Sequence, residues 1–375
     1  MHVTTNQLPA RAKRRVVVAA FAAIAATSLL TACGGGGSAA SPGGATQVTF
    51  AVGSPTLTDS TAPYGAVPQQ LGYWKDQGLD VTVQPTQGAT ASMQLLVAGK
   101  ADIVNGGASA FYQAAEKNPN IRVIQLQKAN VWQTVVPEGS PIKSLSDLKG
   151  KTIGTQSLSS SSYLYGRAAI AAVGLDPDKD VQWLPVGVGS QAAQAFKSGQ
   201  IAAYASYDGP SGVVGTVLGR KLINLPTPLD KVPGSLGIAT TEKFLTDHAD
   251  TVTKFLVGLD KGAIFAAENP AAALQLQWMV QPDQKPRDIS TEQAIQQELP
   301  VVETRFKGGA VPGPNGVIGD LPVSDIQQGI DFMLKNGIIK SGLQAGKVAD
   351  LSLNKKAADM VDAVAIRKQA QNWKP

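Results

Sequence analysis

Short runs of β-branched and apolar residues alternate with longer amphipathic stretches along most of the chain after Gln47. In the first part of this region the runs predict strands over 48–52, 81–84, 103–105 and 123–127. The stretches between them predict helices over 64–77, 90–98 and 108–117. A regular alternation of strands and helices is typical of an α/β sheet with crossover helices, and this is the fold class that we expect.

The same order of signals returns further along the chain. A second set of strands is predicted over 152–154, 181–186 and 202–206, with helices over 160–172, 191–198 and 211–218. In both sets a Gly-Leu-Asp turn precedes a strand, and a glycine-marked turn and a helix follow it; these Gly-Leu-Asp turns lie at 78–80 and 174–176. Any α/β protein contains such units, but the matched order of several signals favours two similar α/β lobes.

The tail of the chain has a different pattern. From about Leu236 onward it is predicted to be mostly helical, with its longest amphipathic stretch over 251–269. Because this tail has no strand–helix–strand order of its own, we expect it to pack back on the first lobe. The expected division is therefore 47–134 with 236–375 for lobe 1, and 135–235 for lobe 2. Two chain crossings, near 131–137 and 233–240, then form a hinge with a ligand cleft between the lobes.

The first 32 residues have the parts of an export signal. Four basic residues precede an uncharged stretch over 16–30; they are Arg11, Lys13, Arg14 and Arg15. This stretch is shorter than the ~20 apolar residues that span a bilayer. It ends in Leu30-Thr31-Ala32-Cys33, which resembles the lipobox of bacterial lipoproteins. The sequence therefore predicts a lipid on Cys33 and a location at the extracytoplasmic face of a membrane. An ordinary signal with a chance cysteine, and export by the twin-arginine route through Arg14-Arg15, are the alternatives.

The composition and charge of the chain exclude several classes of function. The segment 33–46 is rich in Gly, Ser and Ala, which is typical of a flexible tether. Removing the four basic residues with the signal lowers the formal charge from +5 to +1, which argues against a nucleic-acid partner. A single cysteine excludes an intramolecular disulfide and a cysteine-built zinc site. His248 is the one histidine after the signal, and no catalytic spacing includes it, so we expect neither an enzyme nor a metal or cofactor.

One motif points to another class of protein. Residues 187–192, Gly-Val-Gly-Ser-Gln-Ala, follow a predicted strand and open a predicted helix, and Asp208 comes about twenty residues later. This is the outline of a dinucleotide-binding fingerprint. A dinucleotide-binding protein or a periplasmic enzyme is therefore the alternative from a different class.

Four further motifs carry a family resemblance. Residues 72–81, Gly-Tyr-Trp-Lys-Asp-Gln-Gly-Leu-Asp-Val, resemble the first-lobe motif of ABC-transporter substrate-binding proteins of the nitrate/sulfonate/taurine and thiamine-pyrimidine-precursor type. Residues 98–103 and 140–151 are similar to the next motif of that family and to its entry into lobe 2. Tyr207-Asp208-Gly209-Pro210 resembles a variant of its Trp-Asp-Pro element, with Tyr for Trp and an inserted Gly.

The resemblance implies a two-lobe periplasmic-binding-protein fold of type II. It also implies a monomeric solute-binding component of an importer, which binds one small polar molecule and presents it to a membrane permease with its ATPase. The ligand would be a sulfonate, taurine or nitrate, or alternatively a thiamine pyrimidine precursor.

Candidate ligand-binding residues follow strands on both lobes. On lobe 1 the turns after strands and the first predicted helix contribute Ser54, Thr58, Tyr64, Gln87, Gly88, Asn105 and Ser109. On lobe 2 the corresponding residues are Gln156, Ser157, Ser159, Ser160, Tyr207 and Asp208. The serines precede a predicted helix, whose N-terminus suits an anion. They could instead cap that helix or be solvated. Together they predict a negative ligand group near Ser159 and Ser160 and a donor group near Asp208.

Overall fold

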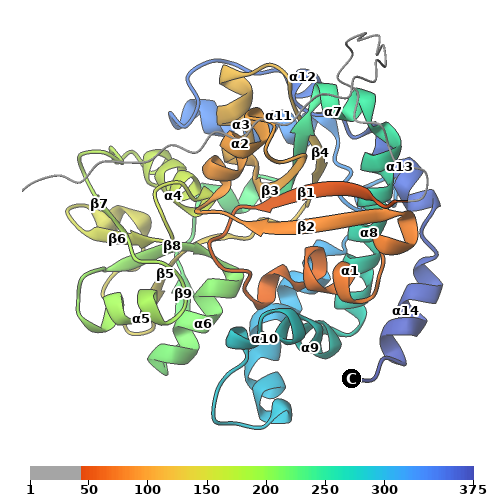
Figure 1. The fold of residues 1–375 in the computed structure, drawn as a ribbon. Coiled ribbons are helices and arrows are strands. Elements are labelled where there is room, and N and C mark those ends of the chain that lie inside the picture. Colours follow the sequence, from red (N-terminus) through yellow and green to blue (C-terminus); the bar gives the residue numbers. More distant parts are fainter. Residues whose placement is uncertain (1–43) are drawn as a thin grey trace, which may run out of the picture. The chain divides into compact units, whose positions relative to one another are not determined.

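The computed structural model describes residues 44–375, which form two five-stranded mixed sheets (Figure 1). The first sheet has the strand order β2-β1-β3-β10-β4, and the second has the order β7-β6-β8-β5-β9. The strands of the first sheet are β1 (Thr46–Val52), β2 (Leu79–Pro85), β3 (Ile103–Gly107), β4 (Ile121–Leu126) and β10 (Leu236–Thr241). Those of the second sheet are β5 (Trp132–Pro137), β6 (Thr152–Thr155), β7 (Gln182–Pro185), β8 (Ala203–Tyr207) and β9 (Leu222–Asn224). The predicted Cys33 lipid site and the export signal lie outside the described residues.

Helices cover both sheets. Those before residue 220 are α1 (Ala66–Gln70), α2 (Ala89–Val97), α3 (Ala108–Lys117), α4 (Ser161–Ala172), α5 (Ser190–Lys197) and α6 (Asp208–Leu218). The later ones are α7 (Glu242–Asp247), α8 (Ala249–Glu268), α9 (Pro270–Val280), α10 (Thr291–Gly309), α11 (Val323–Lys335), α12 (Ala345–Val348), α13 (Ser352–Asp359) and α14 (Ala363–Gln371). Short 3-10 turns are η1 (Asp59–Tyr64), η2 (Lys75–Gln77), η3 (Leu145–Leu148), η4 (Pro228–Lys231) and η5 (Pro282–Gln284). Among residues 44–375, no helix combines the length and apolar character that crossing a membrane requires.

The two sheets repeat one arrangement. In the first sheet β1 pairs in parallel with β2 and β3, and β10 runs antiparallel between β3 and β4. In the second sheet β6 pairs in parallel with β7 and β8, and β5 runs antiparallel between β8 and β9. The predicted α/β fold with two similar lobes is confirmed. The repeated Gly-Leu-Asp signals at 78–80 and 174–176 thus reflect equivalent turns that lead into β2 and β7.

The tail, which was expected to be mostly helical, also contributes the strand β10, which the sequence did not predict. Residues 236–241 return from lobe 2 and insert between β3 and β4, so the first sheet is completed by a distant segment. Gly237 is needed there, because a Cβ on it would lie 2.2 Å from the carbonyl oxygen of Gln125 on β4. A strand of six residues that contains such a glycine has a weak β signal, which is why its pattern was not distinctive.

Two other boundaries differ from the sequence-based expectation. The helix predicted over 64–77 is broken into the end of η1, α1 and η2. Gly65, with φ −134° and ψ −89°, separates η1 from α1, and Gly72, with a φ of 72°, separates α1 from η2. The division expected between residues 134 and 135 falls inside β5, since Trp132 already pairs with Tyr207 of β8. The chain therefore passes from the first sheet to the second over 127–131 and returns over 225–235.

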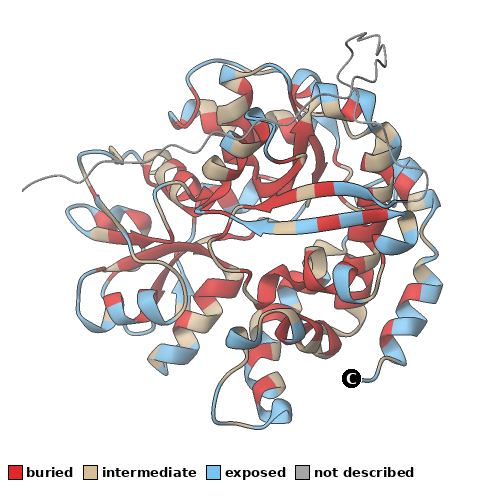
Figure 2. Cartoon of the chain, viewed as in Figure 1, coloured by how far each residue is buried: buried red, intermediate tan, exposed pale blue. Residues whose placement is uncertain are grey.

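Buried residues concentrate on the strands of both sheets and on the helix faces that cover them (Figure 2). The long helix α8 covers one face of the first sheet. There Trp74 stacks on Phe255 with ring centroids 5.3 Å apart, and its indole N–H donates to the Phe255 carbonyl at 3.0 Å. Phe50 of β1 packs edge-on against both rings, so this aromatic cluster holds α8 against the first sheet.

Candidate ligand-binding site between the lobes

A cavity of about 30 Å³ lies at the carboxyl ends of β1, β3, β6 and β8, where the two sheets face each other. We call it the central cavity. Ligands of open α/β sheets bind at such strand ends. The structure brings together there some of the predicted site residues, namely Ser54, Tyr64, Asn105, Gln156, Ser160 and Tyr207. Trp132 also lines the cavity, as do Gly107 and Arg305, which the sequence did not single out as ligand-binding residues.

The lobe 2 wall of the central cavity contains a buried amide with unused hydrogen-bonding capacity. Gln156 is 5% exposed, and its Nε2 atom has no hydrogen-bond partner within residues 44–375. A buried donor of this kind is costly unless a partner satisfies it. Gln156 is therefore a candidate for direct contact with a ligand acceptor.

The serines at the start of α4 are largely occupied by the protein itself. Ser160 caps the helix, because its Oγ accepts from the Tyr163 N–H at 3.2 Å and donates to the Ser157 carbonyl at 2.6 Å. Ser161 Oγ accepts from the Gly107 N–H across the lobes at 2.9 Å. The capping interpretation thus holds for Ser160. The Ser160 hydroxyl lies beside the central cavity, but its hydrogen bonds cap α4.

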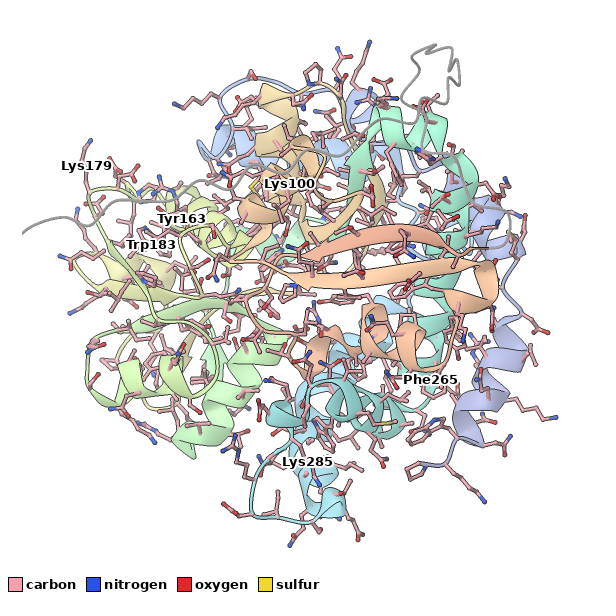
Figure 3. All side chains as sticks on the ribbon, in the orientation of Figure 1. Lys100, Tyr163, Lys179, Trp183, Phe265 and Lys285 are labelled. Atoms are coloured by element: carbon pink, nitrogen blue, oxygen red, sulfur yellow. The ribbon has the colours of Figure 1, made fainter. Side chains whose placement is uncertain are left out.

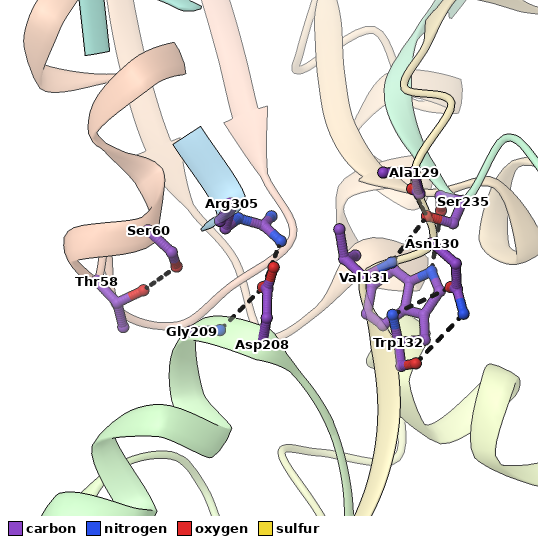
Figure 4. Close-up of polar contacts among 10 residues, drawn as sticks. All are labelled: Thr58, Ser60, Ala129, Asn130, Val131, Trp132, Asp208, Gly209, Ser235 and Arg305. Atoms are coloured by element: carbon purple, nitrogen blue, oxygen red, sulfur yellow. Dashed lines mark hydrogen bonds and ion pairs between the residues drawn. The ribbon is translucent and has the colours of Figure 1, made fainter. Parts of the chain in front are cut away.

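A buried ion pair joins the two lobes beside the central cavity (Figure 4). Arg305 on α10 donates through Nη1 to Oδ1 of Asp208, the first residue of α6, at 2.8 Å. The Arg305 side chain is 5% exposed and that of Asp208 is 21% exposed. Asp208 directly follows β8, as expected, but the role expected of it toward a ligand donor is not supported, since this carboxylate begins α6 and already has a cationic partner.

Aromatic side chains near Arg305 contribute to the pKa of its guanidinium group. Its guanidinium carbon lies 5.2 Å from the ring centroid of Tyr207. Burial by itself lowers the pKa of Arg305, but Asp208 and the nearby tyrosines more than offset it, so the pKa lies above the ordinary arginine value. Burial raises the pKa of Tyr64 to about 12 and also raises that of Tyr207. Both phenols are therefore neutral at physiological pH and can donate hydrogen bonds into the cavity.

Four predicted residues lie where the lobes touch rather than in the central cavity. The carbonyl of Gln87 accepts from Ser157 Oγ at 2.6 Å and from Ser159 Oγ at 2.8 Å. A Cβ on Gly88 would lie 2.5 Å from the carbonyl oxygen of Ser159, so a glycine is needed at this close approach. The anion-binding role expected of Ser159 is not supported by this placement, because its hydroxyl already donates a hydrogen bond to the Gln87 carbonyl across the cleft.

Thr58 lines a larger cavity of about 490 Å³ on the other side of η1. Its hydroxyl lies 2.9 Å from that of Ser60 (Figure 4). Two buried carboxyl groups, Asp59 and Glu298, line the same cavity. Burial and the neighbouring Glu298 raise the pKa of Asp59 to about 8, although the Trp278 indole donates to its Oδ1 at 3.0 Å.

The remaining sequence candidates lie away from the central cavity. Ser109 is fully buried in α3 and does not line it. Residues 187–192 do form a strand-to-helix turn, between β7 and α5, but the Asp208 of that fingerprint is paired with Arg305. In the same lobe Trp183 packs against Tyr163 with ring centroids 5.2 Å apart, and both lie at the outer part of the lobe (Figure 3).

Sequence reasoning missed Arg305, although a signal for it exists. The buried residues of α10 are Ala294, Glu298, Val302, Arg305 and Phe306, which recur at helical spacing. Two charged residues therefore lie on the apolar face of an amphipathic helix. Charged side chains in that position are rarely buried without a partner, and this makes them candidates for a site.

Comparisons with known proteins place the chain in a family. The model of the family described as "NMT1/THI5 like" matches residues 59–273, more than half of the chain, so the protein belongs to the NMT1/THI5-like family. YtlA of Bacillus subtilis, provisionally named a binding protein, is 29% identical over 36% of this chain, and the match spans only 41% of the relative's own length. A protein of Haemophilus influenzae, provisionally named a thiamine biosynthesis protein, is 25% identical over 74% of this chain and 83% of its own.

A solved structure supports the fold. The alkanesulfonate-binding protein SsuA from Xanthomonas axonopodis pv. citri, bound to MOPS, superimposes with a TM-score of 0.62. The two chains are 16% identical, and the match covers 82% of this chain and 99% of that one. At this identity the likeness concerns the fold alone, which is the two-lobe fold of periplasmic substrate-binding proteins.

Proposed function

We propose that the protein is the extracytoplasmic solute-binding component of an ABC importer. It holds one small polar molecule between its lobes and delivers it to a membrane permease with its ATPase. The observation that carries this proposal is the central cavity, where a buried cation from lobe 1, Arg305, and a buried unpartnered amide from lobe 2, Gln156, face the same space. The NMT1/THI5-like family membership and the two-lobe fold support it.

Binding is completed by closure of the lobes about the two crossings. We place the hinge at 127–131 and 225–235, just before β5 and β10, rather than within these strands as the ranges 131–137 and 233–240 suggested. Ser235 connects the crossings, because its Oγ donates to the Ala129 carbonyl at 2.8 Å and its carbonyl accepts from the Trp132 indole at 3.1 Å (Figure 4). Small-angle scattering tests the motion: a cognate ligand should lower the radius of gyration, and identical curves with and without ligand contradict it.

The ligand class that we favour is a small sulfonate, with taurine and nitrate as related cases. An acidic group suits Arg305, Gln156 and the neutral phenols of Tyr64 and Tyr207, because all four line the central cavity and carry hydrogen-bond donors. The cavity is small, so a closed form suits a molecule of few heavy atoms. Native mass spectrometry of freshly purified protein, followed by calorimetry with the released compound, tests this assignment.

A thiamine pyrimidine precursor is the second candidate. The Haemophilus influenzae relative, which matches along most of its length, is the observation that favours it. Calorimetry with ethanesulfonate and with 4-amino-5-hydroxymethyl-2-methylpyrimidine distinguishes the two candidates. The first compound has an acidic group and no heterocycle, and the second has a heterocycle and no acidic group.

We propose binding rather than catalysis. The ionisable side chains that line the central cavity are Tyr64, Tyr207 and Arg305, and none of them is deprotonated near neutral pH. None therefore provides a general base there. His248 is exposed at the end of α7. The ligand should be recovered chemically unchanged after release; conversion of the ligand into a product would favour the enzyme alternative.

Anchoring through Cys33 is part of the same proposal. The lipobox-like run 30–33 and the Gly/Ser-rich segment after it motivate a lipid-anchored monomer at the periplasmic face of a membrane. Intact-mass analysis of membrane-extracted protein should find acylated Cys33 as the new N-terminus, and Cys33→Ala should release the protein from the membrane fraction. An unmodified chain that starts elsewhere contradicts the anchor.

A further inference from the structure

A second, inner cavity of about 40 Å³ adjoins the central cavity within lobe 1. The two cavities share the lining residues Tyr64, Asn105 and Arg305. The inner cavity extends from these residues to Gln125 on β4 and Asp260 on α8. A cavity needs about 10–15 Å³ to hold one water molecule, so the inner one has room for a small ligand group such as an ammonium with its methylene.

Asp260 is a buried acid without a cationic partner. It is 3% exposed, and no ion pair within residues 44–375 includes it. Its Oδ1 accepts one hydrogen bond, from Nε2 of Gln125 at 3.0 Å. Burial raises the pKa of Asp260 to about 7, which this hydrogen bond only partly counteracts. Burying a carboxyl group is costly unless it is protonated or meets a cation. An acid of this kind at a cavity wall suits a ligand that donates hydrogen bonds.

The other charged groups near Asp260 do not satisfy it. Arg305 from α10 and Tyr64 from η1 line the same inner cavity, but Arg305 is paired with Asp208 and Tyr64 is a neutral phenol. On α8 itself the adjacent Lys261 places its ammonium 5.6 Å from the ring centroid of Tyr73. The neighbouring strands β3, β4 and β10 contribute only amide and apolar side chains or glycine to the cavity.

Gln125 is held in place toward Asp260 by the backbone. Gly319 adopts a left-handed φ of 70°, and a Cβ there would lie 1.9 Å from Cγ of Gln125. The Gly319 carbonyl also accepts from the Leu126 N–H at 2.8 Å, which brings this loop against β4. Gln125 therefore presents its amide to Asp260 in a fixed orientation, and the pair is a preorganised recognition surface rather than a mobile one.

We propose that Asp260 is a specificity-determining residue, which accepts hydrogen bonds from an amino or ammonium group that the ligand carries at the end remote from its contact with Gln156. This inference rests on the proposed function and adds that the ligand has an N–H donor group at its inner end. It also replaces Asp208, whose carboxylate is occupied, as the acid that meets such a group. An amino sulfonate and an amino-pyrimidine share this chemistry.

Calorimetry with two matched pairs of probes tests the proposal and distinguishes an amino sulfonate from an amino-pyrimidine as the ligand. Taurine is compared with ethanesulfonate, which lacks the amine. The compound 4-amino-5-hydroxymethyl-2-methylpyrimidine is compared with the same pyrimidine without the 4-amino group. In one pair the wild-type protein should bind the amino member about 10- to 100-fold more tightly, as expected for a hydrogen bond to a charged group. Asp260→Asn should abolish this preference, whereas Glu298→Gln, a buried acid in lobe 1 outside the inner cavity, should keep it.

Different results of these experiments would overturn the role of Asp260 and the proposed solute-binding function. Tight binding of both members of a pair with equal affinity, or an amine preference that survives Asp260→Asn, overturns the role of Asp260 and leaves solute binding intact. Failure to bind any of the four probes overturns the inference. If native mass spectrometry also finds no bound compound, the proposed function fails with it.

A measurement on the wild-type protein alone keeps the test valid if Asp260→Asn does not fold. An ammonium group binds the charged form of Asp260, so the affinity for taurine should rise about tenfold from pH 6 to pH 8 as this carboxyl loses its proton. The affinity for ethanesulfonate should change less than twofold over the same range. If taurine binds more tightly than ethanesulfonate and yet shows a flat pH profile, the amine does not meet Asp260.

Discussion

Nη1 of Arg305 lies 2.8 Å from Oδ1 of Asp208, and the two residues belong to different lobes. Removing Asp208 would leave a buried guanidinium without its carboxylate when the lobes are closed, at a cost of about 2–3 kcal/mol. Asp208→Ala should therefore shift the protein about 30- to 150-fold toward an open form, seen as a larger radius of gyration by small-angle scattering. The double variant Asp208→Ala with Arg305→Met should recover most of the closed form. A double variant as open as the single one would show that the ion pair does not control closure.

Gly107 allows β3 to approach lobe 2 closely. A Cβ on this residue would lie 2.5 Å from Cβ of Ser161 and 2.7 Å from Cζ2 of Trp132, both in lobe 2. Gly107→Ala should prevent full closure and weaken ligand binding at least about tenfold, an effect of ~1.4 kcal/mol or more. Scattering and calorimetry measure both effects. Gly346→Ala is the matched control, because nothing lies within 4 Å of a Cβ there, and it should behave like the wild type.

The shared acceptor at Gln87 predicts a small kinetic effect. Ser157 and Ser159 both donate to this carbonyl across the cleft, and a typical hydrogen bond contributes about 0.5–1.5 kcal/mol. Because the two donors share one acceptor and both contacts are exposed to solvent, their joint loss should cost about as much as one such bond. The double variant Ser157→Ala with Ser159→Ala should therefore release a bound ligand about 2- to 12-fold faster in stopped-flow measurements. The control is Ser198→Ala, since that hydroxyl bonds only carbonyls of its own helix. An unchanged release rate in the double variant would mean that these contacts form only after ligand exchange is complete.

Asp59 makes stability depend on pH. Because its folded-state pKa is raised from 3.8 to about 8, the folded chain keeps a proton that the unfolded chain loses, and the free energy of unfolding should fall as the pH rises from about 4 to 8. The slope for one such group is at most ~1.4 kcal/mol per pH unit. Asp59→Asn should flatten the dependence measured by urea unfolding, and the exposed Asp80→Asn should not. A wild-type stability that rises over this range contradicts the assignment, since Asp260 and Glu298 act in the same direction.

Strand–helix alternation was sufficient to predict the two lobes, because parallel strands buried on both faces leave continuous apolar runs in the sequence. Helix α3 was predicted over its observed bounds, and β1, β3 and β4 within a few residues. The elements that sequence reasoning missed are β5, β9 and β10. All three lie next to the chain crossings, and their pairing partners are distant in sequence, so no local pattern identifies them.

The candidate site was predictable only in part, for a related reason. Residues at the ends of strands or just after them, such as Ser54, Asn105 and Gln156, were identifiable because strand ends converge in this class of fold. Arg305 and Asp260 come from helices that follow the second lobe, and nothing local relates them to those strand ends. The role of Asp208 could not be inferred either, since the partner that occupies its carboxylate lies 97 residues further along the chain.

The insertion of β10 between β3 and β4 has a consequence for how the chain acquires its structure. All strands of the second sheet lie between 132 and 224, so that sheet can form from one uninterrupted segment. The first sheet cannot, because Leu236–Thr241 must arrive before β3 and β4 are joined. During synthesis the strands of the second sheet have therefore all emerged while the first sheet still lacks β10, the strand that joins β3 to β4. Pairing between such distant segments is slow. The first lobe therefore stays incompletely folded, and accessible to chaperones or a translocation machinery, until the return crossing and β10 have been synthesised.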